Sequence, residues 1–141
     1  CCLGAYGPGK CDPGKWPAVS VATSGTHDTE THAVWYDKLS PEHRGYLARI
    51  PGLGHLDVNR GFDDGVRDAL LRVLYQSGSD LCLLPFQDLL GAREQVNVPG
   101  TVDGRNWTYR MPMTVDELLA DDATCDRLRR LATESGRVPA P

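Results

Sequence analysis

Two short apolar runs, each ending in turn-forming residues and followed by polar side chains, stand out along the chain. We predict a buried strand over Val19–Thr23 and a second one within Asp80–Pro85. The connection between them is far too long for a hairpin, so the two strands should lie parallel in a βαβ unit.

Between these strands the apolar positions change to helical spacing. Ala33–Tyr36 indicate a short helix, and Ser40–Ile50 begins with a cap residue and a proline, as a second helix would. The clearest helical pattern covers Phe62–Gln76, after which Gly78 acts as a stop. The glycine-rich stretch Gly52–Gly61 is typical of a loop.

The two ends of the chain differ from this pattern. Residues 1–18 hold several glycines and prolines without periodicity, so we interpret them as a loop or boundary remnant. Thr114 begins a capping box, and the leucines after it supply the apolar face of one or two closing helices. We expect one structured unit over residues 19–138, a tail over 139–141, and a sequence that is a fragment of a longer protein.

Composition and charge exclude several classes of protein. The 141 residues carry 15 basic and 19 acidic side chains, for a net charge of −4, without a basic stripe for a nucleic-acid backbone. No apolar stretch approaches the roughly 20 residues of a membrane-spanning helix. The five cysteines include no Cys-x-x-Cys pair. We expect a soluble cytoplasmic protein with neither nucleic-acid nor membrane partners.

Polar side chains follow the first predicted strand directly, in the segment Gly25–Asp28. Enzymes with parallel strands carry reactive groups at the carboxyl ends of those strands. Asp28 can act there as a nucleophile, general base or electrostatic stabiliser, and His27 can donate hydrogen bonds to a substrate hydroxyl. The alternative is structural, with Asp28 capping the next helix and His27 satisfied in the core.

A metal site is a rival interpretation of this region. His27, Asp28, Glu30 and His32 are four competent ligand types within six residues. Two imidazoles share a helix face when they are four residues apart, whereas His27 and His32 are five apart across a predicted turn. We therefore expect no metal and no other cofactor, and a metal-dependent hydrolase is kept as an alternative.

Two later segments carry further polar groups, and the first of them should lie on the same rim of the sheet as Gly25–Asp28, in a shared cleft. Gln87 and Asp88 follow the second strand, where they can bind hydroxyls, brace catalytic side chains, or cap a one-turn helix. Asn97–Thr101 and Asn106–Arg110 combine amide, aromatic and guanidinium groups, which suit the hydroxyls and C–H faces of pyranose rings. For Trp107 we favour a different role, that of covering the core.

Together these motifs closely resemble the C-terminal part of amylomaltases, the 4-alpha-glucanotransferases of glycoside hydrolase family 77. The matching segments are Ser24–Asp28, Phe86–Gly91, Asn97–Thr101 and Asn106–Trp107. The resemblance implies an α/β fold, the C-terminal portion of a (β/α)8 barrel comprising strands 7 and 8 with flanking helices. It also implies transfer of α-1,4-glucan segments between maltooligosaccharides by a retaining mechanism, with maltooligosaccharides, amylose or glycogen-derived glucans as partners.

The resemblance assigns roles to individual residues. Asp28 matches the third catalytic carboxylate of the family, which grips hydroxyls of the reacting glucose and favours its distortion toward the transition state. His27 would bind the same glucose, and Asn97 an adjacent unit. For Gln87 and Asp88 the resemblance adds no role, and we favour the bracing of catalytic side chains that their position after the second strand suggests. The family's nucleophile and acid/base come from earlier strands and are absent from this sequence.

The resemblance leaves some points open. Thr29-Glu30 stand where family members commonly have Asn-Asp, and Tyr109 stands where a Trp is frequent, so acceptor preference is undecided. Related barrels such as maltooligosyl trehalose synthases share a Thr-His-Asp-Thr segment, and the loop of Asn97 favours amylomaltase over them. Because two catalytic carboxylates are missing, a catalytically inactive glucan-binding fragment is a further alternative.

Overall fold

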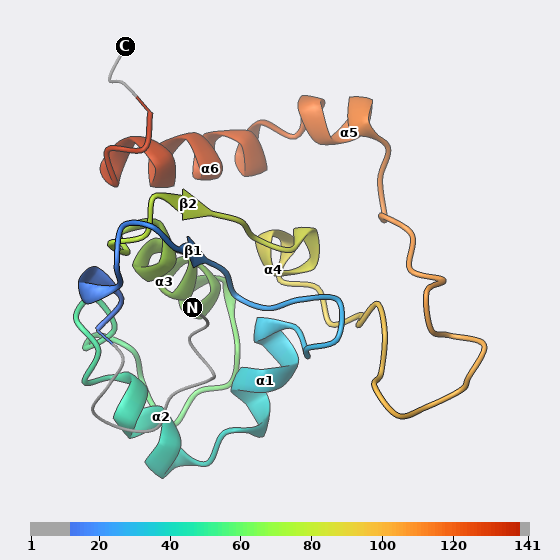
Figure 1. The fold of residues 1–141 in the computed structure, drawn as a ribbon, viewed down its shortest axis with the longest axis horizontal. Coiled ribbons are helices and arrows are strands. Elements are labelled where there is room, and N and C mark those ends of the chain that lie inside the picture. The colour runs from blue at the N-terminus through green and yellow to red at the C-terminus, as the bar shows by residue number, and fades with distance from the viewer. Residues whose placement is uncertain (1–11, 139–141) are drawn as a thin grey trace.

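The structure is a computed structural model that describes residues 12–138. Helices surround a short pair of strands, and a long segment without helix or strand loops out to one side (Figure 1). The elements in chain order are η1 (Pro13–Lys15), β1 (Val21–Ala22), α1 (His32–Lys38), α2 (Pro41–Leu47), α3 (Asp64–Tyr75), β2 (Leu81–Cys82), α4 (Phe86–Leu90), α5 (Val115–Ala120) and α6 (Asp122–Glu134).

The two strands pair in parallel, with Val21 opposite Leu81, as the predicted βαβ unit requires. Each strand has only two residues, fewer than predicted. Hydrogen bonds from Asp80 N to the Ala18 carbonyl at 2.8 Å and from Leu83 N to the Ala22 carbonyl at 2.9 Å extend the contact beyond the strands. In the described part of the chain, each of the two strands pairs with the other alone.

The helices between the strands begin at side-chain caps. Ser40 Oγ accepts a hydrogen bond from His43 N at the start of α2, where Pro41 is the first helical residue. Asp63 caps α3 in the same way, which is why this helix begins at Asp64 and not at the predicted Phe62. The three helices predicted between the strands are thus confirmed, with α2 ending at Leu47, earlier than expected.

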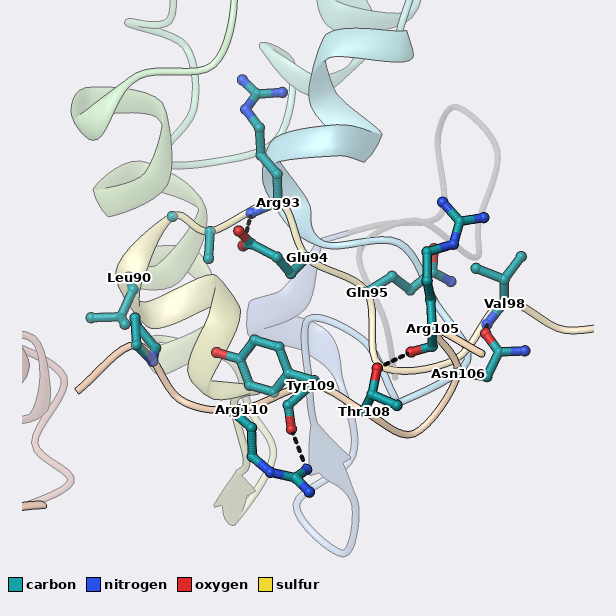
Figure 2. A pocket seen from close by; sticks show the side chains of 13 residues that line it. Leu90, Arg93, Glu94, Gln95, Val98, Arg105, Asn106, Thr108, Tyr109 and Arg110 are labelled. Atoms are coloured by element: carbon teal, nitrogen blue, oxygen red, sulfur yellow. Dashed lines mark hydrogen bonds between the residues drawn. The ribbon is translucent and has the colours of Figure 1, made fainter. Parts of the chain in front are cut away.

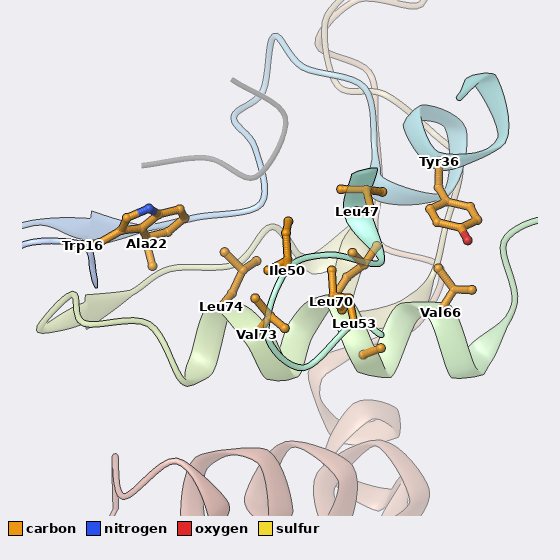
Figure 3. Packing of buried hydrophobic residues seen from close by; sticks show 11 residues of the cluster. Trp16, Ala22, Tyr36, Leu47, Ile50, Leu53, Val66, Leu70, Val73 and Leu74 are labelled. Atoms are coloured by element: carbon orange, nitrogen blue, oxygen red, sulfur yellow. The ribbon is translucent and has the colours of Figure 1, made fainter. Parts of the chain in front are cut away.

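The core lies between α3 and the strands, and side chains of α1 and α2 complete it (Figure 3). The buried cluster consists of Trp16, Ala22, Tyr36, Leu47, Ile50, Leu53, Val66, Ala69, Leu70, Val73 and Leu74. Leu70 and Leu74 are completely buried because the apolar positions of α3 recur at helical spacing on one face.

The beginning of the described chain contributes more than the predicted loop. Pro13–Lys15 form one turn of 3-10 helix, and the Trp16 indole is buried in the core. Gly78 donates its N–H to the Pro13 carbonyl at 2.9 Å, and a Cβ on Gly78 would lie 2.3 Å from the Trp16 carbonyl oxygen. This close approach to the Trp16 carbonyl requires a glycine at position 78.

The C-terminal helices complete the described structure. The predicted capping box is present, with Thr114 and Glu117 bonding each other's backbone N–H at the start of α5. Helix α6 packs against α3, and Arg127 on α6 donates to the Leu89 carbonyl at 2.7 Å. Among residues 12–138, no helix is both long and apolar enough to cross a membrane.

Candidate functional site

The segment after β1 is a tight polar turn. Thr29 Oγ1 accepts a hydrogen bond from Thr26 N at 2.7 Å, and the Thr26 carbonyl accepts from Thr29 N at 3.2 Å. A Cβ on Gly25 would lie 2.2 Å from Thr29 Oγ1, so a larger residue cannot occupy this position without moving the turn. The turn projects His27 and Asp28 outward from the end of the strand.

His27 and Asp28 are partly exposed and in contact with each other. The Nε2 atom of His27 lies 3.2 Å from Asp28 Oδ2, and the two side chains are 53% and 46% exposed. The residue that caps α1 is Thr31, whose hydroxyl accepts from Val34 N. The alternative in which Asp28 caps the helix and His27 lies in the core is therefore wrong.

Asn97 joins this pair from a distant part of the chain. Its Nδ2 donates to Asp28 Oδ1 at 2.6 Å, and its backbone N donates to the His27 carbonyl at 3.1 Å. Gln95 Nε2 adds a hydrogen bond of 3.3 Å to the Asp28 carbonyl. Three predicted site residues thus form one cluster, although Asp28 and Asn97 are 69 positions apart in sequence.

A second turn, which carries Trp107, lies beside this cluster. The Trp107 ring centroid is 5.0 Å from that of His27, with the ring planes tilted by 40°. Trp107 is 62% exposed, so the prediction that it covers the core is wrong. The sequence contained a partial signal of this loop position. Asn106 precedes Trp107, and amide side chains often bond the backbone of their own loop.

Asp88 is buried beneath the cluster, at the start of α4. It is 2% exposed, and its Oδ1 accepts a hydrogen bond from His32 N at 2.7 Å. Its Oδ2 accepts from the hydroxyl of Ser24, at the end of β1. Asp88 therefore contacts the two ends of the segment that carries His27 and Asp28, at Ser24 and at His32.

Gln87 is also buried and lines a cavity of about 280 Å³ next to the turn. His27, Thr31, Asp88 and Glu94 are among the other residues of its wall. The cavity therefore lies between the carboxyl ends of both strands, where the sequence predicted a shared cleft.

Glu94 and Gln95 also line a larger cavity of about 810 Å³ (Figure 2). Tyr109 is half-buried in its wall, and this burial, followed by the nearby Glu94, raises the pKa of the Tyr109 hydroxyl. Arg110 donates to the Tyr109 carbonyl at 3.0 Å. Residues within 90–98 and 105–112 bound the cavity, from the end of α4 and two parts of the long segment between α4 and α5.

The residues of the rival metal site are dispersed. Glu30 pairs with Lys38, and His32 is 3% exposed, beside Trp35. Burial lowers the pKa of His32, while the nearby Asp88 opposes that shift. Among the residues from 12 to 138, no group of three or more His, Cys, Asp or Glu side chains is arranged to hold a metal ion.

The cluster of His27, Asp28 and Asn97 can bind adjacent hydroxyl groups. A carboxylate accepts hydrogen bonds, an amide both donates and accepts, and an imidazole does either according to its protonation. All three groups are held by neighbours in the same two loops, so their spacing is fixed before a ligand arrives. Such an arrangement suits a sugar better than an apolar ligand.

Comparison with known proteins points the same way. The family model for glycoside hydrolase family 77, described as 4-alpha-glucanotransferase, matches residues 6–115. The 4-alpha-glucanotransferase of Streptococcus pneumoniae is 37% identical over 105 residues, which cover 72% of this chain and 19% of that protein. The chloroplastic/amyloplastic enzyme of Solanum tuberosum is 28% identical over 123 residues, covering 84% of this chain and 19% of that protein.

The fold has a similar counterpart among solved structures. Amylomaltase from Streptococcus agalactiae, solved in complex with acarbose, matches with a TM-score of 0.67 and 27% identity. The match covers 88% of this chain and 23% of the amylomaltase. This chain thus spans about a fifth of the length of the relatives it matches.

Proposed function

Because this chain belongs to the 4-alpha-glucanotransferase family, we propose that the whole protein transfers α-1,4-glucan segments between maltooligosaccharides. The observation that carries the proposal is the contact of Asn97 Nδ2 with Asp28 Oδ1 at 2.6 Å, beside His27. It joins two motifs that are remote in sequence into one polar cluster at a strand end.

We propose that β1 and β2 are strands 7 and 8 of a (β/α)8 barrel. Their parallel pairing supports this, as do the polar residues that follow both of them. Leu81 and Leu83 are more than half exposed, and Val21 is 37% exposed. Apolar side chains on one side of a strand pair are expected where further barrel strands would cover them.

The proposed mechanism retains anomeric configuration through a covalent glucosyl-enzyme. Asp28 would hold hydroxyls of the reacting glucose, and its hydrogen bonds would strengthen as the ring flattens toward the transition state. Interactions that strengthen in this way accelerate the reaction, whereas uniformly tight ones only improve binding. His27 would hold the same glucose, and Asn97 would contact the next unit while fixing Asp28.

Gln87 and Asp88 would support this site from below. Asp88 bonds Ser24 and the backbone N of His32, so it sets the position of both ends of the turn. Gln87 lines the cavity beside His27. This arrangement supports a bracing role, in which neither residue takes part in the chemistry.

The proposed partners are maltooligosaccharides, amylose or glycogen-derived glucans. The amylomaltase of Streptococcus agalactiae was solved with acarbose bound, which supports an oligosaccharide ligand here. We propose a cytoplasmic location, and the chloroplastic/amyloplastic enzyme of Solanum tuberosum shows that the family also occurs elsewhere.

The test is the substitution Asp28→Asn in the full-length protein, assayed by disproportionation of maltotriose. We expect turnover to fall by at least about a hundredfold with a much smaller change in KM, because the lost interaction belongs to the transition state. Asp103→Asn is the matched control, since Asp103 is a carboxylate of the long loop that pairs with Arg105. A wild-type rate for Asp28→Asn would refute the proposed role.

The chain alone provides a second test. The family's nucleophile and acid/base are expected on other strands, so residues 1–141 by themselves should bind maltotriose weakly and leave it unreacted. Turnover by this isolated chain would show that a different set of residues performs the chemistry.

A further inference from the structure

Trp107 combines features that ordinary packing does not explain. Its φ angle is +64°, in the left-handed region, and no other non-glycine residue among those described has a positive φ. A bulky residue in this conformation is disfavoured and persists only where its surroundings impose it. Trp107 is also 62% exposed, so burial of the indole does not compensate for the conformation.

The surroundings that impose this conformation are hydrogen bonds of the preceding residue. Asn106 Oδ1 accepts from Val98 N at 3.0 Å, and Asn106 Nδ2 donates to the carbonyl and the hydroxyl of Thr101 at 3.1 and 3.0 Å. Trp107 N then donates to the Val96 carbonyl at 2.8 Å. These bonds anchor the turn to the same segment that carries Asn97.

The consequence of this anchoring is the position of the indole. The centroid of its ring lies 5.0 Å from the centroid of the His27 imidazole. His27 belongs to the segment that follows β1. The His27 side chain is 53% exposed, so about half of its surface is not covered by other protein atoms. The Trp107 indole covers part of the rest.

We propose that Trp107 is a positioning residue that keeps the imidazole of His27 directed toward Asp28. The proposal rests on the proposed function, in which these two side chains hold the reacting glucose. The strained turn fixes the indole, the indole restricts the imidazole, and the imidazole reaches the substrate with little orientational freedom to lose. Trp107 therefore acts on the reaction through His27.

The chain offers a substitution that separates the indole from its backbone. Trp107→Gly removes the ring, and glycine adopts a φ of +64° without strain, so the turn can keep its shape. Trp107→Phe retains an aromatic ring at the same place. Val102→Ala is the control, because Val102 belongs to the same loop and is fully exposed.

The kinetic test uses the full-length protein with maltotriose. We expect Trp107→Gly to lower kcat about tenfold, Trp107→Phe to recover most of the loss, and Val102→Ala to match the wild type. In a His27→Ala background, Trp107→Gly should lower kcat by less than about twofold, because the residue it positions is gone. The inference is overturned if the losses multiply in the double variant, or if Trp107→Gly behaves like Val102→Ala.

A spectroscopic test distinguishes failure of this inference from failure of the proposed function. In NMR spectra of the same protein, Trp107→Gly should shift the ring C–H resonances of His27, assigned from His27→Ala, and leave those of His43 and His55 in place. Unchanged His27 resonances overturn the inference. If the wild type does not act on maltotriose but the His27 resonances shift, the proposed function fails and the ring contact stands.

Discussion

The core around α3 and the cluster around Asp28 are built in opposite ways. Leu70 and Leu74 are completely buried and held by apolar contact from several elements. His27 and Asp28 are about half exposed, and hydrogen bonds from other loop residues hold them in place. Burial of apolar surface contributes most of the folding free energy, whereas an exposed hydrogen bond contributes little. Stability and site geometry should therefore respond to different substitutions.

Asp88 lies at the junction of the two regions. Like a core residue it is buried, and like a site residue it acts through hydrogen bonds, to Ser24 and the backbone N of His32. It is the residue at which the separation between stability and geometry should break down.

The largest effect on stability is expected from Leu70→Ala. Removing a fully buried leucine side chain leaves a cavity and costs about 2–5 kcal/mol of unfolding free energy. Urea denaturation of the chain measures it, with Leu119→Ala as the matched control, since Leu119 on α5 is 68% exposed. The control should stay within about 0.5 kcal/mol of the wild type. Equal effects of the two substitutions would contradict the assigned core.

Asp88→Ala should cost about 1–3 kcal/mol, because the Ser24 hydroxyl and the His32 backbone N–H would lose a buried acceptor. The same substitution should also loosen the turn that carries Asp28, which hydrogen exchange at the Asp28 amide would detect. Asp126→Ala is the control, since Asp126 forms an exposed pair with Arg129 and its loss should change stability by less than about 1 kcal/mol. If Asp88→Ala changed stability alone, the bracing role would be wrong.

A smaller effect on stability, which depends on pH, is expected from the protonation of His32. Burial lowers its pKa from the ordinary value of 6.5, and neither ring nitrogen has a hydrogen-bond partner among the described residues. The unfolded chain therefore binds a proton more readily than the folded one. The contribution of neutral His32 to the stability of the fold is complete above about pH 6.5 and is lost as the pH falls toward the lowered pKa.

Urea midpoints measured between pH 7.5 and pH 5 would test this effect. His32→Leu should flatten the decline in stability over this interval, because the titrating ring is removed while the backbone N–H to Asp88 is retained. His55→Leu, a substitution at an exposed histidine, should leave the decline as in the wild type. An unchanged decline in His32→Leu would assign the pH dependence to another group.

The same contrast explains how much the sequence could predict. Helix α3 was predicted because its apolar positions repeat locally, and the parallel pairing followed from the length of the connection. The turn at Asp28 was placed correctly after a strand because turn residues mark strand ends. Trp16 was missed, since a single buried indole in a glycine- and proline-rich stretch leaves no periodic signal.

The site was harder to predict from local pattern. The bond between Asp28 and Asn97 spans 69 positions, and only the family resemblance brought these motifs together beforehand. The position of Trp107 was predicted wrongly because aromatic residues are usually buried, whereas here the hydrogen bonds of Asn106 hold it outward. Composition does not reveal a conformation that one amide side chain imposes on its neighbour.

The smallest effect on stability is expected from Asn106→Ala, which removes exposed hydrogen bonds to Val98 and Thr101. The unfolding free energy of the chain should fall by no more than about 1 kcal/mol, because water can replace the lost partners. Hydrogen exchange at the Val98 and Trp107 amides should nevertheless become faster, since the turn loses the bonds that define it. Thr108→Ala is a control in the same turn, because it removes a single bond to the Arg105 carbonyl. If Asn106→Ala destabilised the chain as much as Leu70→Ala, the loops would belong to the folding core, and the separation between stability and site geometry would not hold.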